Sequence, residues 1–485
     1  MQKLFKHQEE GIAFLIKKKK ALLADQMGLG KTRQAIVSAT QVGNSNLVLC
    51  PASLKTNWAR EILMVEPDAS ITIYNGKKEE PYSQGHGGTW EIVNYDIISR
   101  DYNRKKLKEK HFDTAILDEA HYIKNSKSKR TKTALEIVKD IQNCYLLTGT
   151  PMMNRPEELF TLLRAINHPL GASWYTYVMD YCGAFWRVTS KERYNPKTGR
   201  MEQVKFLDTS GATNLPKLRE KIQPVYLRRT KKILGDLLPA KVIANVDVEI
   251  TKEDRKKYEA VWDEYMDYIE NNPIIFSDLT EEERQEKLEN IKQAKHLVEL
   301  QKLKQVASQA KVKTVVSDVV NIVEQGEKVI IFTQYTETLR QLRAELRKEK
   351  ILAVTLSGED DQTARQLSID AFQRNDKVKV FIGNIKAAGV GITLTEASTV
   401  IFADMEWTPA LHEQAEDRAH RIGQQSQVNV YYYIAKGTIE QDIVELLGRK
   451  SQIISTILEG KQQRAKQISV ANELIKKLST RRATE

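Results

Sequence analysis

Lys31 and Thr32 follow a glycine-rich turn, and their types and spacing indicate phosphate chemistry. The turn, Gly28-Leu29-Gly30, comes after an apolar run over residues 21–24 and before a helix-like segment. A strand, a loop of backbone N–H groups and a helix N-terminus together form an anion site. Lys31 would reach the β- and γ-phosphates of a nucleotide, and the Thr32 hydroxyl would bind Mg²⁺. The full pattern begins with glycine where this chain has Asp25, so an ordinary strand–turn–helix stays open at this point.

Asp118 and Glu119 form a second candidate group at the end of an apolar run over residues 114–117. A carboxylate at a strand end can hold the Mg²⁺ that bridges two phosphates, and its neighbour can orient and deprotonate the attacking water. We assign the first role to Asp118 and the second to Glu119. An acidic pair at a strand end is more often a solvated cap. Its combination with Lys31-Thr32 in one sheet favours ATP hydrolysis.

A third group lies far along the chain, on a helix that we expect over residues 414–424. Arg418 and Arg421 are three positions apart and therefore share a helix face. Two guanidinium groups directed at a neighbouring ATP site would stabilise the transition state at the γ-phosphate. A helix surface with two arginines is common, so this pair alone indicates nothing.

These groups must be positioned by sheets, because strand-like and helix-like runs alternate along the chain. Such alternation predicts parallel sheets, in which ligands bind beyond the carboxyl ends of the strands. The predicted strands form two series, 47–50, 91–95, 114–117 and 145–147, then 329–332, 353–356, 378–382, 399–402 and 428–434. The chain is thus expected to hold two α/β domains, of which the first alone carries the phosphate loop.

Three further segments are expected around these domains. Strand-like runs over 185–194 and 201–207 flank a turn signal and predict a β-hairpin inserted on the first domain. Aromatic residues between Trp174 and Trp186 could stack on bases, although a small satellite core is the favoured interpretation. A charged helical protrusion and linker is expected before the second domain, and a basic helical tail after it.

Composition limits the class of protein. The 485-residue chain has a net charge of +11 and a pI of about 9.1, so an acidic polymer is a plausible partner. Its three cysteines lack metal-ligand spacing, which predicts a reducing compartment and no zinc site. No run reaches membrane-spanning length, and the N-terminus lacks a signal-peptide core.

Seven motifs occur in one order along the chain. They are His7-Gln8, DQMGLGKT at 25–32, PASL at 51–54, DEAH at 118–121, LTGTP at 147–151, LRRTK at 227–231 and QAEDRAHRIGQ at 414–424. This set resembles the Swi/Snf-type double-stranded DNA translocases of helicase superfamily two. Residues 207–215 and 385–394 resemble the annealing-helicase (HepA-related) branch, although Thr393 stands where many members have asparagine.

The resemblance implies an α/β fold of two tandem RecA-like lobes with ATP between them. The implied boundaries are lobe 1 over 1–235 with an insertion at about 171–215, a helical linker and protrusion over 236–310, lobe 2 over 311–450, and a basic tail over 451–485. The implied partner is duplex DNA, contacted mainly at its phosphate backbone, and the implied cofactors are ATP and Mg²⁺. We expect an intracellular monomer, cytoplasmic in a bacterium or phage and nuclear in a eukaryote, recruited by an unknown protein.

The resemblance also implies roles at matching positions. Nucleotide contacts are expected from His7, Gln8 (reading adenine), Asp25, Met27, Gly28, Leu29, Gly30, Lys31, Thr32 and Gly391. Catalysis is expected from Lys31, Asp118, Glu119, Arg418 and Arg421, and metal binding from Thr32 and Asp118. Coupling of hydrolysis to DNA is expected from Thr148, Thr150 and Gln414, and DNA contacts from Lys55, Asn94, Thr333, Lys386 and Trp407.

Three alternatives remain open from the sequence. One is a strand-separating or strand-annealing helicase acting on forked DNA. Another is a catalytically silent DNA-binding scaffold, which the presence of Lys31, Asp118 and Arg418 argues against. The third is activity directed by RNA, because basic charge does not distinguish the nucleic acids.

Overall fold

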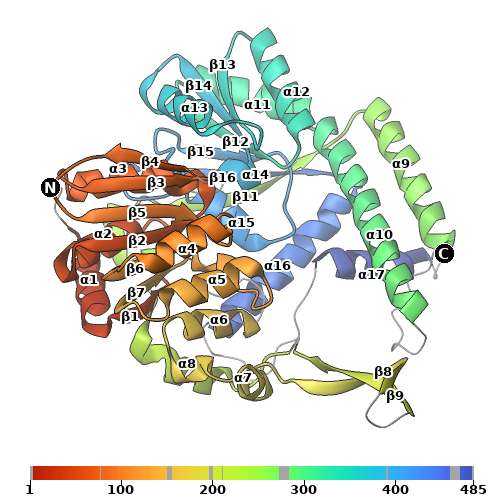
Figure 1. The fold of residues 1–485 in the computed structure, drawn as a ribbon. Coiled ribbons are helices and arrows are strands. Elements are labelled where there is room, and N and C mark those ends of the chain that lie inside the picture. Colours follow the sequence, from red (N-terminus) through yellow and green to blue (C-terminus); the bar gives the residue numbers. More distant parts are fainter. Residues whose placement is uncertain are drawn as a thin grey trace. The chain divides into compact units, whose positions relative to one another are not determined.

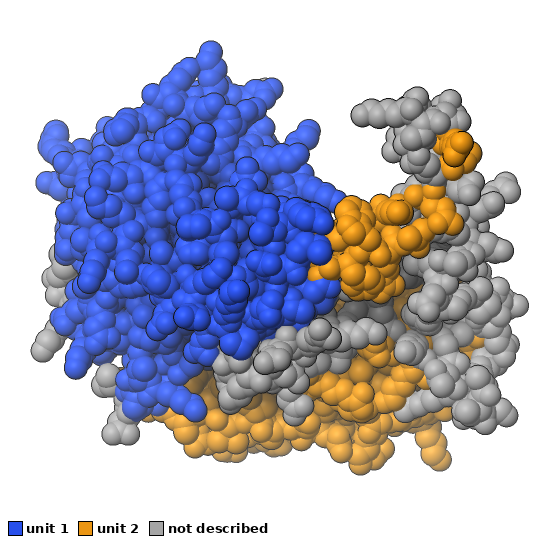
Figure 2. Space-filling view, turned by 90° about the horizontal axis from the view of Figure 1, so that it is seen from below, with its two compact units in different colours: residues 1–183, 209–238, 456–466 blue, residues 184–208, 239–455, 467–485 orange. Residues whose placement is uncertain are grey.

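The fold contains one mostly parallel β-sheet, one fully parallel β-sheet and a separate hairpin (Figure 1). The computed structural model describes residues 4–76, 78–149, 156–195, 200–209, 211–271, 283–388, 392–458 and 470–482. The chain divides into two compact units, which Figure 2 shows in different colours. The first unit contains residues 1–183, 209–238 and 456–466, and the second contains 184–208, 239–455 and 467–485.

The first unit is built on an eight-stranded sheet in the order β10-β1-β7-β6-β2-β5-β3-β4. Its strands are β1 (Lys20–Leu23), β2 (Ser45–Cys50), β3 (Ser70–Asn75), β4 (Lys78–Ser83), β5 (Thr89–Asn94), β6 (Thr114–Asp118), β7 (Asn143–Leu147) and β10 (Tyr226–Leu227). All neighbours pair in parallel except β3 and β4. The central strands are buried along nearly their whole length, as expected for a parallel sheet covered on both faces.

The first unit also contains helices. They are α1 (Lys6–Lys18), α2 (Lys31–Val42), α3 (Lys55–Val65), α4 (Asp101–Glu109), α5 (Lys129–Val138), α6 (Glu157–Ala165), α7 (Trp174–Tyr181) and α8 (Leu215–Ile222). Five short 3₁₀ helices join them: η1 (Ala52–Leu54), η2 (Ala120–Ile123), η3 (Pro169–Gly171), η4 (Gln223–Val225) and η5 (Lys231–Leu237).

The second unit is built on a six-stranded, fully parallel sheet in the order β11-β16-β15-β12-β14-β13. Its strands are β11 (Lys241–Val248), β12 (Val329–Thr333), β13 (Leu352–Leu356), β14 (Val378–Asn384), β15 (Thr399–Phe402) and β16 (Val428–Ala435). Its helices are α9 (Lys252–Asn271), α10 (Glu283–Ala310), α11 (Val312–Glu324), α12 (Thr336–Lys348), α13 (Gln362–Arg374), α14 (Ile385–Ala388), α15 (Pro409–Glu416), α16 (Ile439–Leu458) and α17 (Val470–Arg482).

Three apolar cores stabilise the second unit. One lies between the sheet and α11–α12, and another between the sheet and α13–α15. The third joins α9, α10, α16 and α17 through side chains such as Tyr265, Leu303, Ile443 and Leu474. The last helix, α17, is therefore part of a packed core. Among the described helices, none is long and apolar enough to cross a membrane.

The predicted hairpin is confirmed as β8 (Phe185–Asn195) and β9 (Arg200–Asp208), which pair antiparallel and with no other described strand. The aromatic residues before it divide into two sets. Tyr177 and Tyr181 are buried, and the Tyr177 ring packs at a tilted angle against both Phe160 and Tyr181, which forms the satellite core that the sequence favoured. Phe185 and Trp186 are exposed.

The structure adds β3, β4 and β10 to the strands expected from the sequence, and it differs from the expected organisation around the two domains at two further points. The span 236–310 was predicted to be a helical linker, but it contains β11, an edge strand that runs parallel to β16. β11 was missed because it is half exposed and has no continuous apolar run. The hairpin was predicted as an insertion on the first domain, whereas its contacts group residues 184–208 with the second unit. Because its strands join neither large sheet, strand pairing does not decide that membership.

Candidate functional site

Three of the predicted motifs emerge from three adjacent parallel strands of the first unit. The glycine-rich loop follows β1, the segment with Thr148 follows β7, and Asp118 ends β6. The register pairs Leu23 with Leu147, and Leu147 with Asp118. Because parallel strands place their carboxyl ends at one edge, the sheet brings these motifs together.

The glycine-rich loop takes backbone conformations that favour glycine. Gly28 has φ 83° and Gly30 has φ 73°, both in the left-handed region. The side chains of Met27 and Leu29 in this loop are buried, and the Leu29 carbonyl lies 3.1 Å from Nε2 of His7. The loop therefore rests on α1 and leads directly into α2, whose first residues are Lys31 and Thr32.

Gln8 lies directly against this loop. Its Oε1 accepts a hydrogen bond from the backbone N–H of Phe5 at 3.1 Å, and a Cβ placed on Gly30 would collide with its Nε2. The side chain is buried. The structure thus places Gln8 next to the expected phosphate loop, while its expected role in reading adenine stays a prediction.

Asp25 replaces the usual first glycine, and its side chain has a clear structural partner. It is fully buried, and Arg229 of the LRRTK motif donates to it from Nε at 3.0 Å and from Nη2 at 2.5 Å. The backbone N–H of Arg229 donates to the same carboxylate at 3.0 Å. Arg229 also donates to Gln34 and to the His7 carbonyl. Sequence reasoning did not assign Arg229 a role, although LRRTK was noticed as a motif.

Lys31 folds back on the loop, donating from Nζ to the Asp25 carbonyl at 2.7 Å. Its charge also acts on Asp118, whose pKa it lowers in part. The phosphate-loop lysine and the acidic pair are therefore electrostatically coupled within the first unit.

Asp118 is a buried carboxylate with two hydrogen-bond donors. Trp58 Nε1 donates to its Oδ2 at 2.8 Å, and the backbone N–H of Glu119 donates to Oδ1 at 2.9 Å. Burial, followed by the charge of Glu119, raises the pKa of Asp118 to about 6. Trp58 was not among the site residues predicted from the sequence. Its indole N–H fixes the orientation of the Asp118 carboxylate.

Glu119 adopts a left-handed backbone conformation with φ 48°, which is unusual for a non-glycine residue. Its Oε2 lies 3.2 Å from Nδ1 of His121, and that nitrogen lies 3.4 Å from Oγ1 of Thr148. A polar chain thus connects the acidic pair to the segment after β7. Thr150 lies outside the described residues.

Arg418 and Arg421, which belong to the second unit, do not share a helix face, contrary to the prediction. Helix α15 ends at Glu416, and Arg418 and Arg421 lie in the tight turns that follow. The helix ends because the chain folds into hydrogen-bonded turns, in which Arg421 N–H bonds to Ala419 and Gln424 N–H bonds to Arg421. The two side chains nevertheless converge, because both donate to the Ile392 carbonyl, at 3.3 and 3.4 Å.

Thr393, which stands where many members of the resembled family have asparagine, accepts a hydrogen bond from Arg421 at 2.8 Å. Gln424 donates to the carbonyls of Thr395 and Ala397, so the motif over residues 414–424 also holds the chain just after Thr393. Gln414 is buried, and its carbonyl accepts from Arg418. Gly391 lies outside the described residues.

A buried polar network joins the strand ends of the second unit. The Asp404 carboxylate accepts hydrogen bonds from Ser308 at 2.8 Å, from Thr333 at 2.6 Å and from the backbone N–H of Gln334 at 2.7 Å. Lys304 of α10 lies at the same place, where it donates to Gln334 Oε1 at 3.2 Å. Burial lowers the pKa of Lys304 to about 8.

Lys304 also contacts Trp407, one of the residues predicted to bind DNA. Its Nζ lies 4.1 Å from the ring centroid of Trp407, a cation–π arrangement. Lys386 forms an ion pair with Glu406, 3.1 Å from its Oε1, and Asn384 donates to the Gln334 carbonyl. The segments that carry Thr333, Lys386 and Trp407 are thus held in one network.

The predicted DNA contacts differ in accessibility. Lys386 is exposed and Trp407 is partly exposed. Thr333, Lys55 and Asn94 are buried, and Lys55 donates to the Tyr74 carbonyl at 2.8 Å and to Asn75. These three side chains therefore lie in the protein interior.

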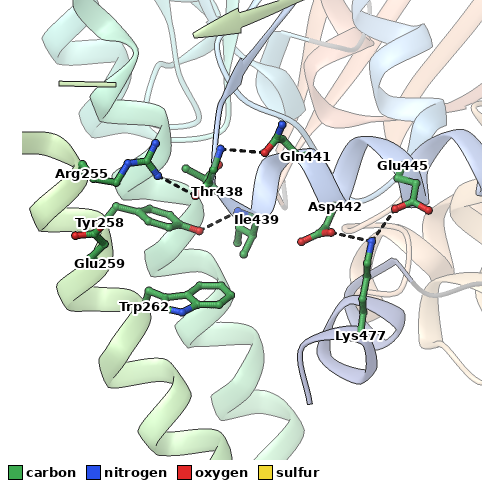
Figure 3. Close-up of a pocket in the computed structure, with 11 residues that line it drawn as sticks. Arg255, Tyr258, Glu259, Trp262, Thr438, Ile439, Gln441, Asp442, Glu445 and Lys477 are labelled. Carbon is green, nitrogen blue, oxygen red and sulfur yellow. Dashed lines mark hydrogen bonds and ion pairs between the residues drawn. The ribbon is translucent and has the colours of Figure 1, made fainter. Parts of the chain in front are cut away.

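A pocket of about 580 Å³ lies elsewhere in the second unit, between α9, α16 and α17 (Figure 3). Tyr258 and Trp262 form an aromatic wall, and Lys477 bridges Asp442 and Glu445 at 2.8 and 2.7 Å. The pocket contains none of the residues predicted for ATP binding, catalysis, coupling or DNA contact. Its ion pairs attach α17 to α16.

Comparison with known proteins identifies the family. A model of the SNF2-related domain matches residues 7–351, well over half of the chain, and a model of the helicase conserved C-terminal domain matches residues 311–423. The chain belongs to the SNF2-related family. The resemblance drawn from the ordered motifs is thereby confirmed, as is the α/β fold with parallel sheets flanked by helices.

Curated SNF2-related proteins resemble almost the whole chain. The mouse DNA annealing helicase and endonuclease ZRANB3 is 29% identical over 473 residues, which are 95% of this chain and 41% of that protein. The SWI/SNF-related regulator of chromatin subfamily A-like protein 1 homolog of Caenorhabditis elegans is 29% identical over 94% of this chain and 62% of that protein. An uncharacterised ATP-dependent helicase of Mycoplasma genitalium is 29% identical over 94% and 42%, respectively.

The chain therefore spans less than two thirds of the length of these relatives. Among solved structures, the Sulfolobus solfataricus SWI2/SNF2 ATPase core in complex with dsDNA is 27% identical, with a TM-score of 0.41 over 94% of this chain and 93% of that one.

Proposed function

We propose that this SNF2-related chain is an ATP-driven motor that moves along double-stranded DNA and remodels DNA structures or DNA-bound proteins. The observation that carries the proposal is the convergence of the glycine-rich loop, Asp118-Glu119 and Thr148 at the carboxyl ends of β1, β6 and β7. This set matches what ATP hydrolysis requires, namely a phosphate cradle, a metal-binding carboxylate and a base. Names of the relatives, which include an ATP-dependent helicase, support it.

Within the proposed site, Lys31 neutralises charge on the β- and γ-phosphates, and Glu119 orients and deprotonates the attacking water. The backbone conformation of Glu119 and its contact with His121 hold the Glu119 carboxylate in one direction. Thr148 would sense the state of Glu119 through His121, which makes it a candidate for coupling. Gln414 and Thr150 keep their expected coupling roles.

Mg²⁺ would be held by Asp118 and the Thr32 hydroxyl, and the donor set fits this ion. Both are hard oxygen ligands, and the raised pKa of buried Asp118 indicates a site that a divalent cation would stabilise. When bound, the ion supplies charge neutralisation at the phosphates. Trp58 keeps the carboxylate oriented for it.

Arg418 and Arg421 are proposed to stabilise the γ-phosphate transition state. Their common contact with the Ile392 carbonyl supports a joint action, because it keeps the two guanidinium groups together. DNA is proposed to contact the segments after β12, β14 and β15, with Lys386 and Trp407 as the accessible side chains. These contacts are expected mainly at phosphates, since a translocase must ignore sequence.

We further propose that the protein acts as a monomer, recruited by a partner not identified by its sequence. It would work inside the cell, in the bacterial cytoplasm or the eukaryotic nucleus.

The decisive experiment measures phosphate release without nucleic acid and with duplex DNA, single-stranded DNA or RNA. We expect the strongest stimulation by duplex DNA, and displacement of the third strand from a DNA triplex. Lys31→Ala should abolish hydrolysis while leaving DNA binding largely intact. Hydrolysis by Lys31→Ala at the parent rate would refute the site, and equal rates with and without duplex DNA would refute the motor.

A second candidate function, annealing of complementary strands at forks, is favoured by the name of the mouse relative. It predicts that ATP drives reannealing of a partly unwound duplex. A strand-separating helicase would instead unwind a forked duplex in the same assay.

A further inference from the structure

The hairpin of β8 and β9 exposes large apolar side chains that it cannot bury itself. The exposed fractions are 50% for Phe185, 54% for Trp186, 51% for Val188, 56% for Met201 and 40% for Phe206. A lone two-stranded ribbon has no apolar core, and exposed aromatic groups on such an element mark an interaction surface.

The register places aromatic and basic side chains together on both faces. Arg187 pairs with Phe206, and Phe185 lies on the same face two residues away. The Arg187 guanidinium lies 5.1 Å from the Phe185 ring centroid, while its Nε lies 2.8 Å from Asp208. On the opposite face, Trp186 lies two residues from Val188, which pairs with Lys205.

The charge of the hairpin is positive. Residues 185–208 contain six lysine and arginine residues against three acidic residues. A protein partner that covered an apolar surface would favour one continuous stripe, but Arg187 lies between Phe185 and Phe206 on one face, and Lys205 lies beside Val188 and diagonal to Trp186 on the other. Alternating cations and aromatic rings suit a ligand with stacked planar groups joined by phosphates.

From this arrangement we propose that the hairpin binds single-stranded nucleic acid. Phe185, Trp186 and Phe206 stack on unpaired bases, and Arg187 and Lys205 contact the phosphates. Paired bases inside a duplex have no free faces, so the ligand is the unpaired part of a DNA substrate. The inference goes beyond the proposed function, because it concerns binding to unpaired nucleotides and needs no ATP.

The test uses the whole chain and a fluorescent oligothymidylate, which forms no duplex, in anisotropy titrations without ATP. The double variant Trp186→Ala/Phe206→Ala should bind it at least about tenfold more weakly, since each stacked base contributes substantially. Tyr82→Ala, which removes an exposed aromatic group from β4, should bind like the parent. Lys205→Gln should weaken the salt dependence of binding.

A second measurement does not depend on how the double variant folds. A base stacked on Trp186 quenches its fluorescence, so the quenching by oligothymidylate should be smaller in Trp186→Phe, whose affinity should stay close to that of the parent. Equal quenching in parent and variant, or unchanged binding by the folded double variant, would overturn the proposal and point to a protein partner for the hairpin. Repeating the titrations with Lys31→Ala separates this result from any failure of the proposed motor, because that variant cannot hydrolyse ATP.

Discussion

Arg229 and Asp25 lie 204 positions apart in the chain, yet the guanidinium group of Arg229 binds both carboxylate oxygens of Asp25. The pair is almost completely removed from solvent. The pair fastens the start of the glycine-rich loop to the segment that follows β10. Arg229 also donates to Gln34 near the start of α2, so the same side chain links the loop to the helix. The departure at Asp25 from the usual glycine is thus part of a specific contact.

Arg229→Met should destabilise the first unit strongly. It leaves a buried carboxylate without its cation, which typically costs about 3–5 kcal/mol. Urea unfolding would measure this loss, and nucleotide binding should weaken as well. The double variant Asp25→Asn/Arg229→Met should recover part of the stability, because it removes the unpaired charge. A double variant less stable than the single one would contradict this account.

Gly30→Ala should impair nucleotide binding while leaving the sheet intact. Its φ of 73° disfavours any Cβ, at about 1–2 kcal/mol, and the new Cβ would collide with Gln8. Adding Gln8→Ala should relieve the collision and restore part of the stability in urea unfolding, but nucleotide affinity should stay low, because Gln8 is itself an expected adenine contact. Titration with a fluorescent ATP analogue would measure the affinity. Unchanged affinity in Gly30→Ala would show that the loop tolerates another conformation.

The ATPase should need more Mg²⁺ at acid pH, because Asp118 is proposed to hold the ion. The pKa of Asp118 is raised to about 6, and only its ionised form binds a cation, so the Mg²⁺ concentration for half-maximal ATPase activity should rise as the pH falls through 6. Trp58→Phe removes a hydrogen bond that lowers this pKa, so the transition should move to higher pH. Magnesium titrations at a series of pH values would measure it.

The matched control is Trp90→Phe, which alters another buried tryptophan whose indole N–H donates to Glu66. It should leave the pH of the transition unchanged. A parallel shift in both variants would mean that the effect comes from core packing. No shift in Trp58→Phe would mean that Trp58 does not influence the pKa of Asp118.

Lys304 should make stability depend on pH in the alkaline range. Its pKa is about 8 in the folded protein against an ordinary 10.5, so between these pH values the unfolded chain binds more protons. Stability should therefore rise with pH across this window relative to Lys304→Met, by up to about 3 kcal/mol. Urea unfolding of both proteins at several pH values would measure the difference.

Lys302→Met is the control, since Lys302 is on the same helix but its side chain is 47% exposed. It should follow the parent. Lys304→Met should also lower the stimulation of the ATPase by duplex DNA, because Trp407 and Gln334 lose the cation that holds them. If Lys304→Met has the same pH dependence as the parent, Lys304 is not the titrating group.

The sequence by itself determined the family, the two series of parallel strands and the hairpin. These conclusions rest on local signals, which are apolar runs, turn residues and ordered motifs such as 25–32 and 414–424. It did not reveal β11, because this edge strand has no continuous apolar run and alternates only over the short stretch from Ala244 to Val248. It placed Arg418 and Arg421 on a helix, because spacing alone cannot locate the turns that end α15.

Only the tertiary structure decided which residues support the motifs. Arg229 beneath Asp25, Trp58 beside Asp118 and Lys304 beneath Trp407 are partners from distant segments or adjacent layers. The same holds for Thr333 and Lys55, whose burial is set by packing. The physical reason is that burial, desolvation and side-chain hydrogen bonds depend on long-range contacts, whereas a motif reports only the residues next to it in the chain.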